Sequence, residues 1–525
     1  MEKVNQGPES PARRVAGIAR VGARYGFGFV FGSRLIPHRR RAEPGRVGTR
    51  LRRSFEELGP TFVELGRYLA SRRDLLPPDV AAELGRPAGA IRPVTFAEVR
   101  TLLERELGNT MERLFLSFEE GPARVGVFTQ SHRAVLPGER PALVVVNRPG
   151  IRRDLLAMRP VADLTRRRLG DRLPLDPSVS VAEFVALAGH RRDMYFAAQT
   201  ARRLRGLDGF GLRVPEVYRG YSSAKCVTLE APAKSAVPDT SGYGAVSAAL
   251  VRLAFEEGIF LADLAPERFV VGDGEVWLAD PTETVALDLE RLRGVAETLA
   301  AVRRGDVDGV TRVLPLAGTF VPRDTTELRR ELRETLGALG GPLWREHSLS
   351  EARDRGLEAL RKGKTKLNAE LAQMLESMVA AERLGGERRT SIVEAAEAAE
   401  VVVARYRDPR YVAARTARKL AQPDAYADYP RQIHSFLEEL KDGEVEVRFQ
   451  HGGLDDLISK VDILANRLVF AVLIAALIIG SSMIGIFSEA GARLLGVSVF
   501  GLIGFVFAAI LGLLLLIGII RSGRL

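Results

Sequence analysis

The chain has 525 residues, of which 46% are hydrophobic and 27% are charged. This balance excludes a fibrous or wholly disordered protein, and the length allows roughly two to four domains. The formal net charge of +10 suits an anionic partner, either nucleic acid or a membrane surface. Cys226 is the single cysteine, which excludes an internal disulfide, and the six histidines lack the spacing of a metal site.

The N-terminal region divides by composition. Residues 1–53 are basic and rich in glycine, and we expect a flexible tail there. Residues 54–120 have apolar residues at helical spacing, interrupted by Pro77-Pro78 and Pro87, and are predicted to form a helical extension.

The middle of the chain alternates between strand and helix patterns. Strands are predicted at Arg124–Ser131, Ala134–Leu136, Ala142–Asn147 and Val227–Glu230, and helices at about Ile151–Arg168, Val181–Arg205 and Gly244–Glu257. Phe269–Val271 and Val276–Ala279 flank a Gly-Asp-Gly turn and are predicted to form a hairpin. This order is typical of an α+β, protein-kinase-like two-lobe fold, with an N-lobe over residues 121–232 and a C-lobe over residues 233–415.

Two uncharged segments follow juxtamembrane helices expected over residues 416–466. Leu468–Phe487 has twenty residues and Val497–Ile520 has twenty-four, and a helix needs about 20 to cross a bilayer. The short link between them predicts an antiparallel transmembrane hairpin over residues 467–521.

Charges around this hairpin predict its orientation. Lys460 and Arg467 precede it and Arg521 and Arg524 follow it, so the soluble domain and both termini are expected in the cytoplasm. We therefore expect membrane lipid, and no nucleic acid, as the anionic partner. Small residues recur every four positions, and such stripes allow the hairpin or a dimer to pack; they are Ala471, Ala475, Ala476 and Gly480, then Gly504, Ala508 and Gly512.

Several short motifs, in a fixed order along the chain, point to one protein family. They are Leu58-Gly59-Pro60-Thr61-Phe62, Leu65-Gly66, Arg73-Asp74-Leu75-Leu76-Pro77, Gln130 with His132, Arg133 and Ala134, and Arg148-Pro149-Gly150-Ile151. In this order the chain resembles the UbiB family of atypical kinase-like proteins from about Phe55 to its C-terminus. The resemblance implies a membrane protein linked to isoprenoid-quinone or lipid metabolism, with enzymes of those pathways as partners.

The nucleotide site implied by the resemblance is degenerate. A kinase uses a lysine on its third strand to hold the phosphates and a helical glutamate to position that lysine. Val145 falls at the lysine position. The family's paired acidic motif falls on Arg191-Arg192-Asp193, with Ala197 at the second glutamate, so Asp193 alone is retained.

The catalytic loop is also altered. Asp263 and Asp280 match the two aspartates of the kinase frame, but Arg268 replaces the asparagine that binds magnesium. A guanidinium has no lone pair to give to a metal. We expect Arg268 to supply positive charge to both aspartates instead.

The motifs from Leu58 to Pro77 resemble the family's signature helix, and a compensated exchange is expected there. Where the family has a lysine facing the first glutamate of the acidic motif, this chain has Glu64 facing Arg191. Because both signs are inverted, we expect an ion pair of Glu64 with Arg191 or Arg192 that holds the helix over the cleft.

These observations predict a membrane-anchored, UbiB-like pseudokinase that acts as an accessory or scaffold, with no catalytic residue, metal or cofactor assigned. One alternative is an active atypical kinase or ATPase that binds ATP and Mg²⁺ through Asp263 and Asp280, with the hinge at Glu230 contacting the adenine. Another alternative is a lipid-binding protein with a hydrophobic ligand in the cleft.

Overall fold

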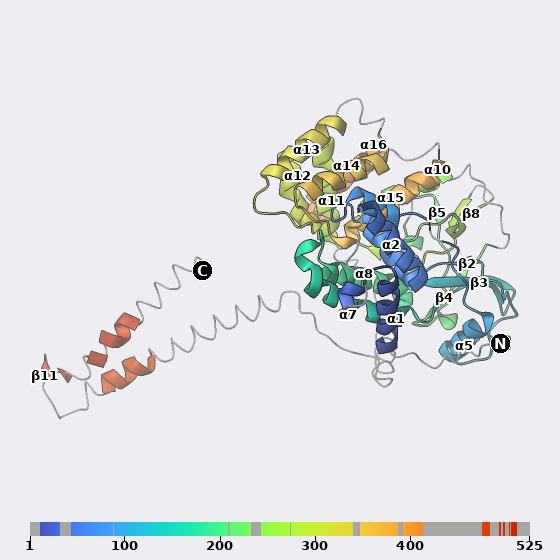
Figure 1. The fold of residues 1–525 in the computed structure, drawn as a ribbon, viewed down its shortest axis with the longest axis horizontal. Helices are drawn as coiled ribbons and strands as arrows, with labels where there is room; N and C mark the ends of the chain where they lie inside the picture. Colours follow the sequence, from blue (N-terminus) through green and yellow to red (C-terminus); the bar gives the residue numbers. More distant parts are fainter. Residues whose placement is uncertain are drawn as a thin grey trace. The chain divides into compact units, whose positions relative to one another are not determined.

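The computed structural model comprises two compact units, Met1–Pro423 and Asp424–Leu525 (Figure 1). Structure is described for residues 11–31, 44–87, 89–207, 210–232, 243–272, 275–339, 347–386, 392–411, 413, 475–483, 493–494, 497–498, 503–504 and 506–511. The expected juxtamembrane helices of residues 416–466 lie outside these ranges.

The N-lobe contains an antiparallel sheet in the order β1-β3-β4-β6, with β2 also paired to β3. Its strands are β1 (Ser117–Phe118), β2 (Arg124–Val125), β3 (Thr129–Leu136), β4 (Arg140–Asn147) and β6 (Cys226–Glu230). The prediction of one strand over Arg124–Ser131 is wrong, because the chain reverses after Val125 and brings Arg124 opposite Ser131. A Cβ at Gly126 would lie 2.6 Å from Nη1 of Arg124, so the glycine leaves room for the Arg124 side chain beside this turn.

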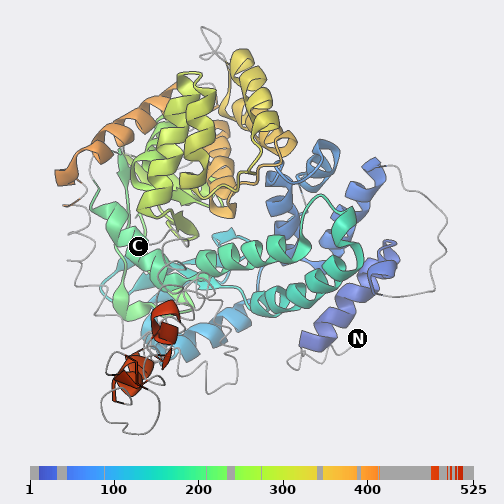
Figure 2. The ribbon, with the colours of Figure 1, turned by 90° about the vertical axis from the view of Figure 1, so that its left-hand side faces the viewer.

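Three helices follow β4: α7 (Ile151–Leu169), α8 (Pro177–Arg192) and α9 (Met194–Arg205). The predicted helix Val181–Arg205 is divided at Asp193, whose ψ of 100° ends α8. The Asp193 carboxylate then accepts a hydrogen bond from the Phe196 amide and caps α9. α7 and α8 pack side by side (Figure 2).

The basic N-terminal region differs from the expected flexible tail. It contains α1 (Pro11–Arg24), η1 (Gly28–Phe31) and most of α2 (Pro44–Leu58), before α3 (Pro60–Ser71) and α4 (Pro78–Leu84). α1 packs against α7, with Ile18 buried and Arg14 Nε 2.8 Å from Asp154 Oδ1. The arginine-rich composition concealed this amphipathic helix because its apolar face is narrow.

The connection from α4 to the sheet contains α5 (Phe96–Leu107) and α6 (Met111–Leu114). A capping box formed by Thr95 and Glu98 begins α5. Val99 and Leu103 of α5 are buried in the cluster that also contains Leu136 of β3, which anchors this extension to the sheet.

The C-lobe is mainly helical. Its helices are α10 (Tyr243–Glu257), α11 (Leu289–Arg303), α12 (Val307–Val313), α13 (Thr326–Leu339), α14 (Leu349–Lys362), α15 (Ala369–Leu384) and α16 (Ile392–Arg407). Its short strands are β7 (Ile259–Leu261), β8 (Phe269–Gly272), β9 (Glu275–Leu278) and β10 (Thr284–Ala286), and β5 (Leu212–Arg213) pairs in parallel with β9. The antiparallel pairing of β8 and β9 confirms the predicted hairpin.

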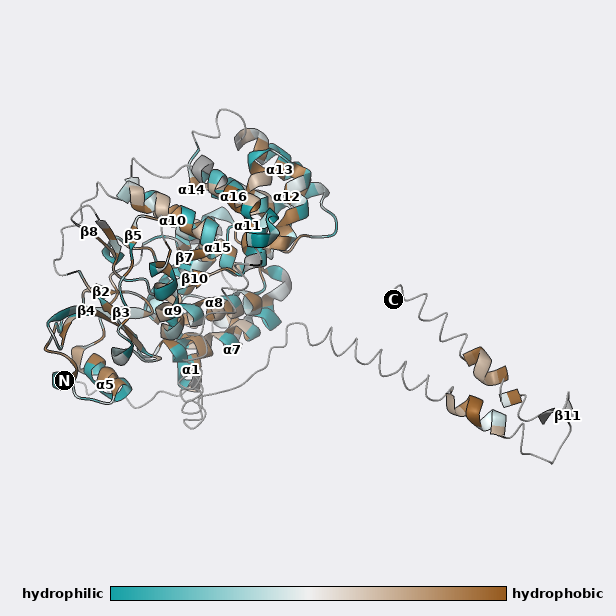
Figure 3. Ribbon diagram, turned by 180° about the vertical axis from the view of Figure 1, so that it is seen from behind, coloured by the Kyte–Doolittle hydropathy of each residue, from teal (hydrophilic) through white to brown (hydrophobic). Residues whose placement is uncertain are grey.

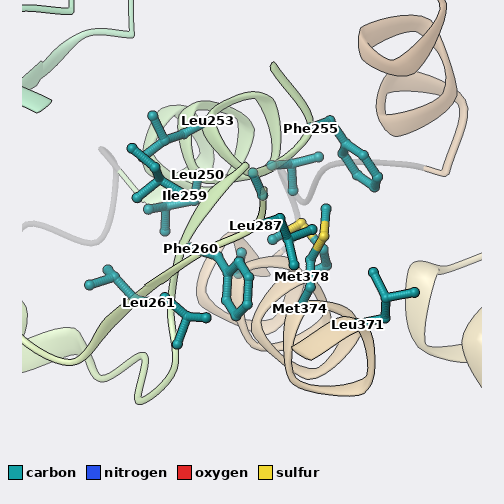
Figure 4. Close-up of a cluster of buried hydrophobic side chains, with 14 of the residues drawn as sticks. Leu250, Leu253, Phe255, Ile259, Phe260, Leu261, Leu287, Leu371, Met374 and Met378 are labelled. Carbon is teal, nitrogen blue, oxygen red and sulfur yellow. The ribbon is translucent and has the colours of Figure 1, made fainter. Parts of the chain in front are cut away.

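The main core includes residues of both lobes, and its C-lobe part surrounds β7. Phe260 of β7 lies among Leu250 of α10, Leu287, and Met374 and Met378 of α15 (Figure 4). Burial of such side chains contributes about 1.5–3 kcal/mol each. This packing holds the segment from β7 to β10 in place, and that segment carries the two candidate aspartates.

The second unit includes helical residues 475–483 and 506–511 and a short antiparallel pair, β11 (Arg493–Leu494) and β12 (Val497–Ser498). Val497 and Ser498 are therefore strand residues, although the prediction made Val497 the first residue of an uncharged membrane segment. Within the described ranges, no helix has both the length and the apolar character needed to cross a bilayer. Most of the two predicted spans lies outside those ranges.

Candidate functional site

A buried ionic cluster joins the two lobes at the position of the kinase cleft. Asp263 follows β7, Asp280 follows β9, and Arg268 ends the 3₁₀ turn of Pro266–Arg268. The Arg268 side chain is fully buried, with Nη1 3.1 Å from Asp280 Oδ2 and Nη2 3.6 Å from Asp263 Oδ2. One guanidinium thus lies against both aspartates, in the arrangement that the sequence led us to expect.

Arg268 also holds the backbone of the loop after β9. Its Nη1 donates hydrogen bonds of 3.0 Å to the carbonyl oxygens of Asp280 and Thr282. The Asp280 carboxylate in turn accepts the Thr282 amide at 3.0 Å. These bonds fix the Asp-Pro-Thr segment, which lacks the glycine of a mobile kinase loop.

A second arginine reaches the same carboxylates from the N-lobe. Arg124 lies on β2, with Nη2 3.0 Å from Asp263 Oδ2 and Nε 3.8 Å from Asp280 Oδ2. Its side chain is 8% exposed. Sequence reasoning missed Arg124, because a contact 139 residues away in the chain leaves no local pattern.

Glu283 is the other residue that the sequence did not reveal. It has a left-handed φ of 59° and a fully buried side chain. Its Oε1 accepts a 2.8 Å hydrogen bond from the Thr129 hydroxyl, and its Oε2 accepts a 2.7 Å bond from Arg191 Nη2. The acidic residue directly after Asp280-Pro281-Thr282 was the available signal, but only the fold shows that it turns inward.

The structure brings Glu64 and Arg191 together. Arg191 Nη1 donates to Glu64 Oε1 at 2.5 Å, and both side chains are less than 10% exposed. The Arg191 guanidinium also lies over the Phe128 ring, 4.6 Å from its centroid. Glu64, on α3, is thereby linked through Arg191 to Glu283.

The turn after α3 is joined to the C-lobe by another buried pair. Arg72 is 1% exposed and makes two 3.0 Å bonds to Asp74. Arg72 also donates to the Leu367 carbonyl at 2.8 Å, while the Leu367 amide donates to Asp74 at 2.9 Å. These contacts hold the signature helix against the C-lobe.

Electrostatics keep the two aspartates ionised. Burial alone would raise the pKa of Asp263, but the charges of Arg268, Arg124 and Arg191 outweigh it and lower the pKa to about 2. Burial opposes ionisation of Asp280 as well, and Arg268 and Arg124 again lower its pKa. Neighbouring carboxylates raise the pKa of Arg124 and Arg191 despite their burial.

Comparisons with known proteins identify the family of this chain. A model of the ABC1 atypical kinase-like domain matches residues 88–314, and a model of the ABC1/UbiB kinase-like C-terminal domain matches residues 452–521. The chain belongs to the ABC1/UbiB family. An "uncharacterized protein in hydrogenase 1 5'region" of Clostridium pasteurianum is 24% identical over 546 residues, covering 98% of this chain and 99% of that protein. The resemblance inferred from the sequence is therefore confirmed.

Two solved structures are also similar to this ABC1/UbiB chain. The complex structure of Rv3197 with erythromycin from Mycobacterium tuberculosis is 18% identical, covers 65% of this chain and 87% of that one, and has a TM-score of 0.42. The Rio2 kinase complex with ADP/Mg²⁺-phosphoaspartate from Chaetomium thermophilum is 15% identical. The match covers 62% of this chain and 96% of the Rio2 chain, with a TM-score of 0.22.

Val145, which the sequence analysis aligned with the family's phosphate-binding lysine, is an apolar core residue. Val145 on β4 is 0% exposed and belongs to the main hydrophobic core. Asp193, which the sequence aligned with the acidic motif, caps α9, and Ala197 is buried. Arg148, which directly follows β4, donates to the Arg92 carbonyl. These residues serve packing and capping.

Residues 230–232, the hinge expected after β6, have their backbone donors bonded within the protein. The Glu230 amide donates to the Glu216 carbonyl at 2.8 Å, and the Ala231 amide donates to the Pro141 carbonyl at 3.1 Å. Pro232 has no amide hydrogen. Within the described residues 230–232, every backbone donor that an adenine could use is therefore engaged or lacking.

The residues present do not fit a magnesium ion. Mg²⁺ requires carboxylate or carbonyl oxygens at about 2.0–2.1 Å with near-octahedral geometry. Here the facing oxygens of Asp263 and Asp280 contact Arg124 and Arg268. Among the residues that the structure describes, no group of three or more His, Cys, Asp or Glu is arranged for a metal. The two aspartates therefore contact arginine side chains of their own chain in the place where a metal ion would lie.

Proposed function

We propose that this protein is a pseudokinase of the ABC1/UbiB family, anchored to a membrane by a C-terminal hairpin and acting without phosphoryl transfer. Its function would be to present the kinase-like domain at the membrane to enzymes of isoprenoid-quinone or lipid metabolism. The pathway in this proposal rests on the family resemblance alone.

The placement of Arg124 and Arg268 is the observation that carries the proposal. Phosphoryl transfer depends on metal ions that bridge the phosphates and neutralise developing charge. Two guanidinium groups against Asp263 and Asp280 already neutralise the aspartates. A metal would have to displace Arg124 and Arg268, and Arg268 also donates hydrogen bonds to the loop backbone, which strongly disfavours metal binding.

The buried links across the cleft support a scaffolding role. Glu64, Arg191 and Glu283 connect α3 to the loop after β9, and Arg72 connects the turn after α3 to Leu367. Nucleotide entry between the lobes would require these charged contacts to separate. A cleft held shut in this way favours a fixed surface for partners over a cycle of opening and closing.

Membrane attachment is supported by the composition and packing of the second unit. Large apolar side chains are exposed on its helical segments, which Figure 3 colours mainly as hydrophobic; they are Ile478, Ile479, Met483, Ile503, Val506, Phe507 and Ile510. A Cβ added to Gly504 would lie 2.3 Å from Ser481 Oγ, and Ala508 is fully buried. Small residues inside and large apolar residues outside favour a hairpin surrounded by lipid.

The double variant Arg124→Ala/Arg268→Asn tests the proposal. Removal of both guanidinium groups leaves Asp263 and Asp280 without the arginines that contact them, while Glu283 keeps Arg191, and we expect the variant to gain Mn²⁺ binding. Titration of the full-length, detergent-solubilised protein, followed by electron paramagnetic resonance of free Mn²⁺, measures this gain.

The matched control is Arg293→Ala/Arg303→Asn, which removes two arginines from α11 outside the cleft and should leave Mn²⁺ binding unchanged. Circular dichroism establishes that each variant is folded. Strong Mn²⁺ binding by the unaltered protein, lost in Asp280→Asn, would overturn the pseudokinase proposal.

A further inference from the structure

A separate cavity lies on the N-lobe, lined by the start of β4, the C-terminal turns of α9 and residues 215–221. Its volume is about 500 Å³ and it is open to solvent. Four arginines line it: Arg140, Arg202, Arg205 and Arg219. These residues come from three different parts of the chain, so the fold alone brings them together.

The lining carries an excess of positive charge. Among the described residues that line the cavity, Glu216 is the one acid, and Glu230 lies close enough to influence the neighbouring Tyr218. Burial and then the Glu230 charge raise the pKa of Tyr218, so its phenol stays neutral. Arg205 Nη1 lies 3.5 Å from Glu216 Oε2, so one of the four guanidinium groups is paired with this acid. The positive charge of the lining still exceeds its negative charge, which favours the entry of an anion.

Hydrogen bonds and a cation–π contact connect the residues that form the walls of the cavity. The Tyr218 amide donates to the Thr228 carbonyl at 2.8 Å, and the Thr228 hydroxyl donates to the Tyr221 carbonyl at 2.6 Å. The Arg140 guanidinium lies over the Tyr218 ring, 5.1 Å from its centroid, and its Nε donates to the Pro137 carbonyl. A preformed arrangement loses little conformational entropy when a ligand binds.

The site is also accessible. A Cβ placed on Gly220 would meet no atom within 4 Å, and the side chain of Arg205 is 50% exposed. Arginine binds phosphate through paired hydrogen bonds, which an open ring of guanidinium groups can supply from several directions.

We propose that this cavity, named here the arginine pocket (Arg140, Arg202, Arg205, Arg219 and Gly220), binds a phosphate-bearing ligand. The phosphate belongs either to a soluble diphosphate or to a lipid headgroup with a terminal phosphate. The pocket is built from residues outside the kinase-like cleft, so this assignment stands whether or not the cleft binds nucleotide.

Calorimetry on the full-length, detergent-solubilised protein tests the proposal with two probes. Pyrophosphate represents the soluble source, and short-chain phosphatidic acid below its micelle concentration represents the headgroup. We expect saturable binding of at least one probe. The variant Arg140→Gln/Arg205→Gln should weaken that binding at least about tenfold, because two charge-assisted contacts are removed. Short-chain phosphatidylcholine, whose phosphate is covered by choline, should not bind.

The control Arg312→Gln/Arg333→Gln removes the same charge from exposed positions on α12 and α13 and should bind as the unaltered protein does. Gly220→Glu supplies an independent variant, since it places a carboxylate in the opening and should also abolish binding. Binding of pyrophosphate but not phosphatidic acid supports a soluble ligand, and the reverse supports a lipid. No binding of either probe at millimolar concentration, or equal weakening by the control, would overturn the proposal.

Discussion

Arginine side chains lie in very different surroundings in the kinase-like cleft and in the arginine pocket. In the cleft, Arg124, Arg191 and Arg268 are at most 8% exposed and each contacts carboxylates. In the arginine pocket, four arginines surround an open cavity that contains one acid in its described lining. Charge balance and burial, more than residue type, therefore separate an internal structural cluster from a site with capacity for an external anion.

Arg268→Met should have the largest effect on stability. It removes the fully buried cation and leaves Asp263, Asp280 and Glu283 without that partner. Breaking a buried ion pair costs about 3–5 kcal/mol of unfolding free energy. Urea unfolding followed by tryptophan fluorescence measures this loss. Arg312→Met, at an exposed position, should cost less than about 0.5 kcal/mol. Equal stabilities would mean that the cleft cluster does not support the fold.

Glu64→Gln should have the next largest effect. Arg191 would keep Glu283 but lose its charged partner on α3, at a cost of about 2 kcal/mol. The Arg191→Met variant should cost more, because both Glu64 and Glu283 lose a buried cationic partner. A double-mutant cycle on unfolding free energy measures the coupling between the two residues. Strictly additive losses would remove the proposed role of this pair in docking α3.

Low pH should lower the unfolding free energy through Asp263, by less than the substitutions at Arg268 and Arg191 do. The folded-state pKa of Asp263 is about 2, below its ordinary 3.8. Its contribution is therefore complete above about pH 5 and is lost as the pH falls through 4 towards 2, with a magnitude of about 2 kcal/mol. Unfolding free energies measured across this range should show a shallower slope in Asp263→Asn. An unchanged slope would contradict the charge assignment.

Variants of the arginine pocket should affect stability least. Arg140→Gln/Arg205→Gln should change the unfolding free energy by less than about 0.5 kcal/mol, because solvent screens exposed charges. Differential scanning fluorimetry in low salt measures this effect. A large destabilisation would show that the pocket arginines are structural, as in the cleft, and would remove the contrast between the two regions.

The sequence predicted the parts of the fold that local patterns encode. The Gly-Asp-Gly hairpin, the strands before and after the turn at Pro137, and the helix Tyr243–Glu257 all follow from periodicity and turn residues. The facing positions of Glu64 and Arg191 were expected because two sign changes occurred at residues that the family pairs. Asp263, Arg268 and Asp280 were singled out because the resemblance to the family aligns them with its catalytic-loop and metal-binding motifs.

Other features depend on contacts between distant segments. Arg124 reaches Asp263 only because the chain reverses at Gly126, and the sequence pattern favoured one continuous strand there. Glu283 turns inward through a left-handed backbone conformation that is uncommon for glutamate. The arginine pocket joins Arg140 with the end of α9 and residues 215–221, and the abundance of arginine elsewhere in the chain hides such a grouping.

Nucleotide binding by the full-length, detergent-solubilised protein, measured by calorimetry with and without Mg²⁺, tests the central claim most directly. With Arg124 and Arg268 against Asp263 and Asp280, and Val145 at the phosphate-binding position, we expect no magnesium-dependent binding of ATP at millimolar concentration. Binding that requires Mg²⁺ and disappears in Asp280→Asn would contradict the account and would identify the cleft as an active nucleotide site.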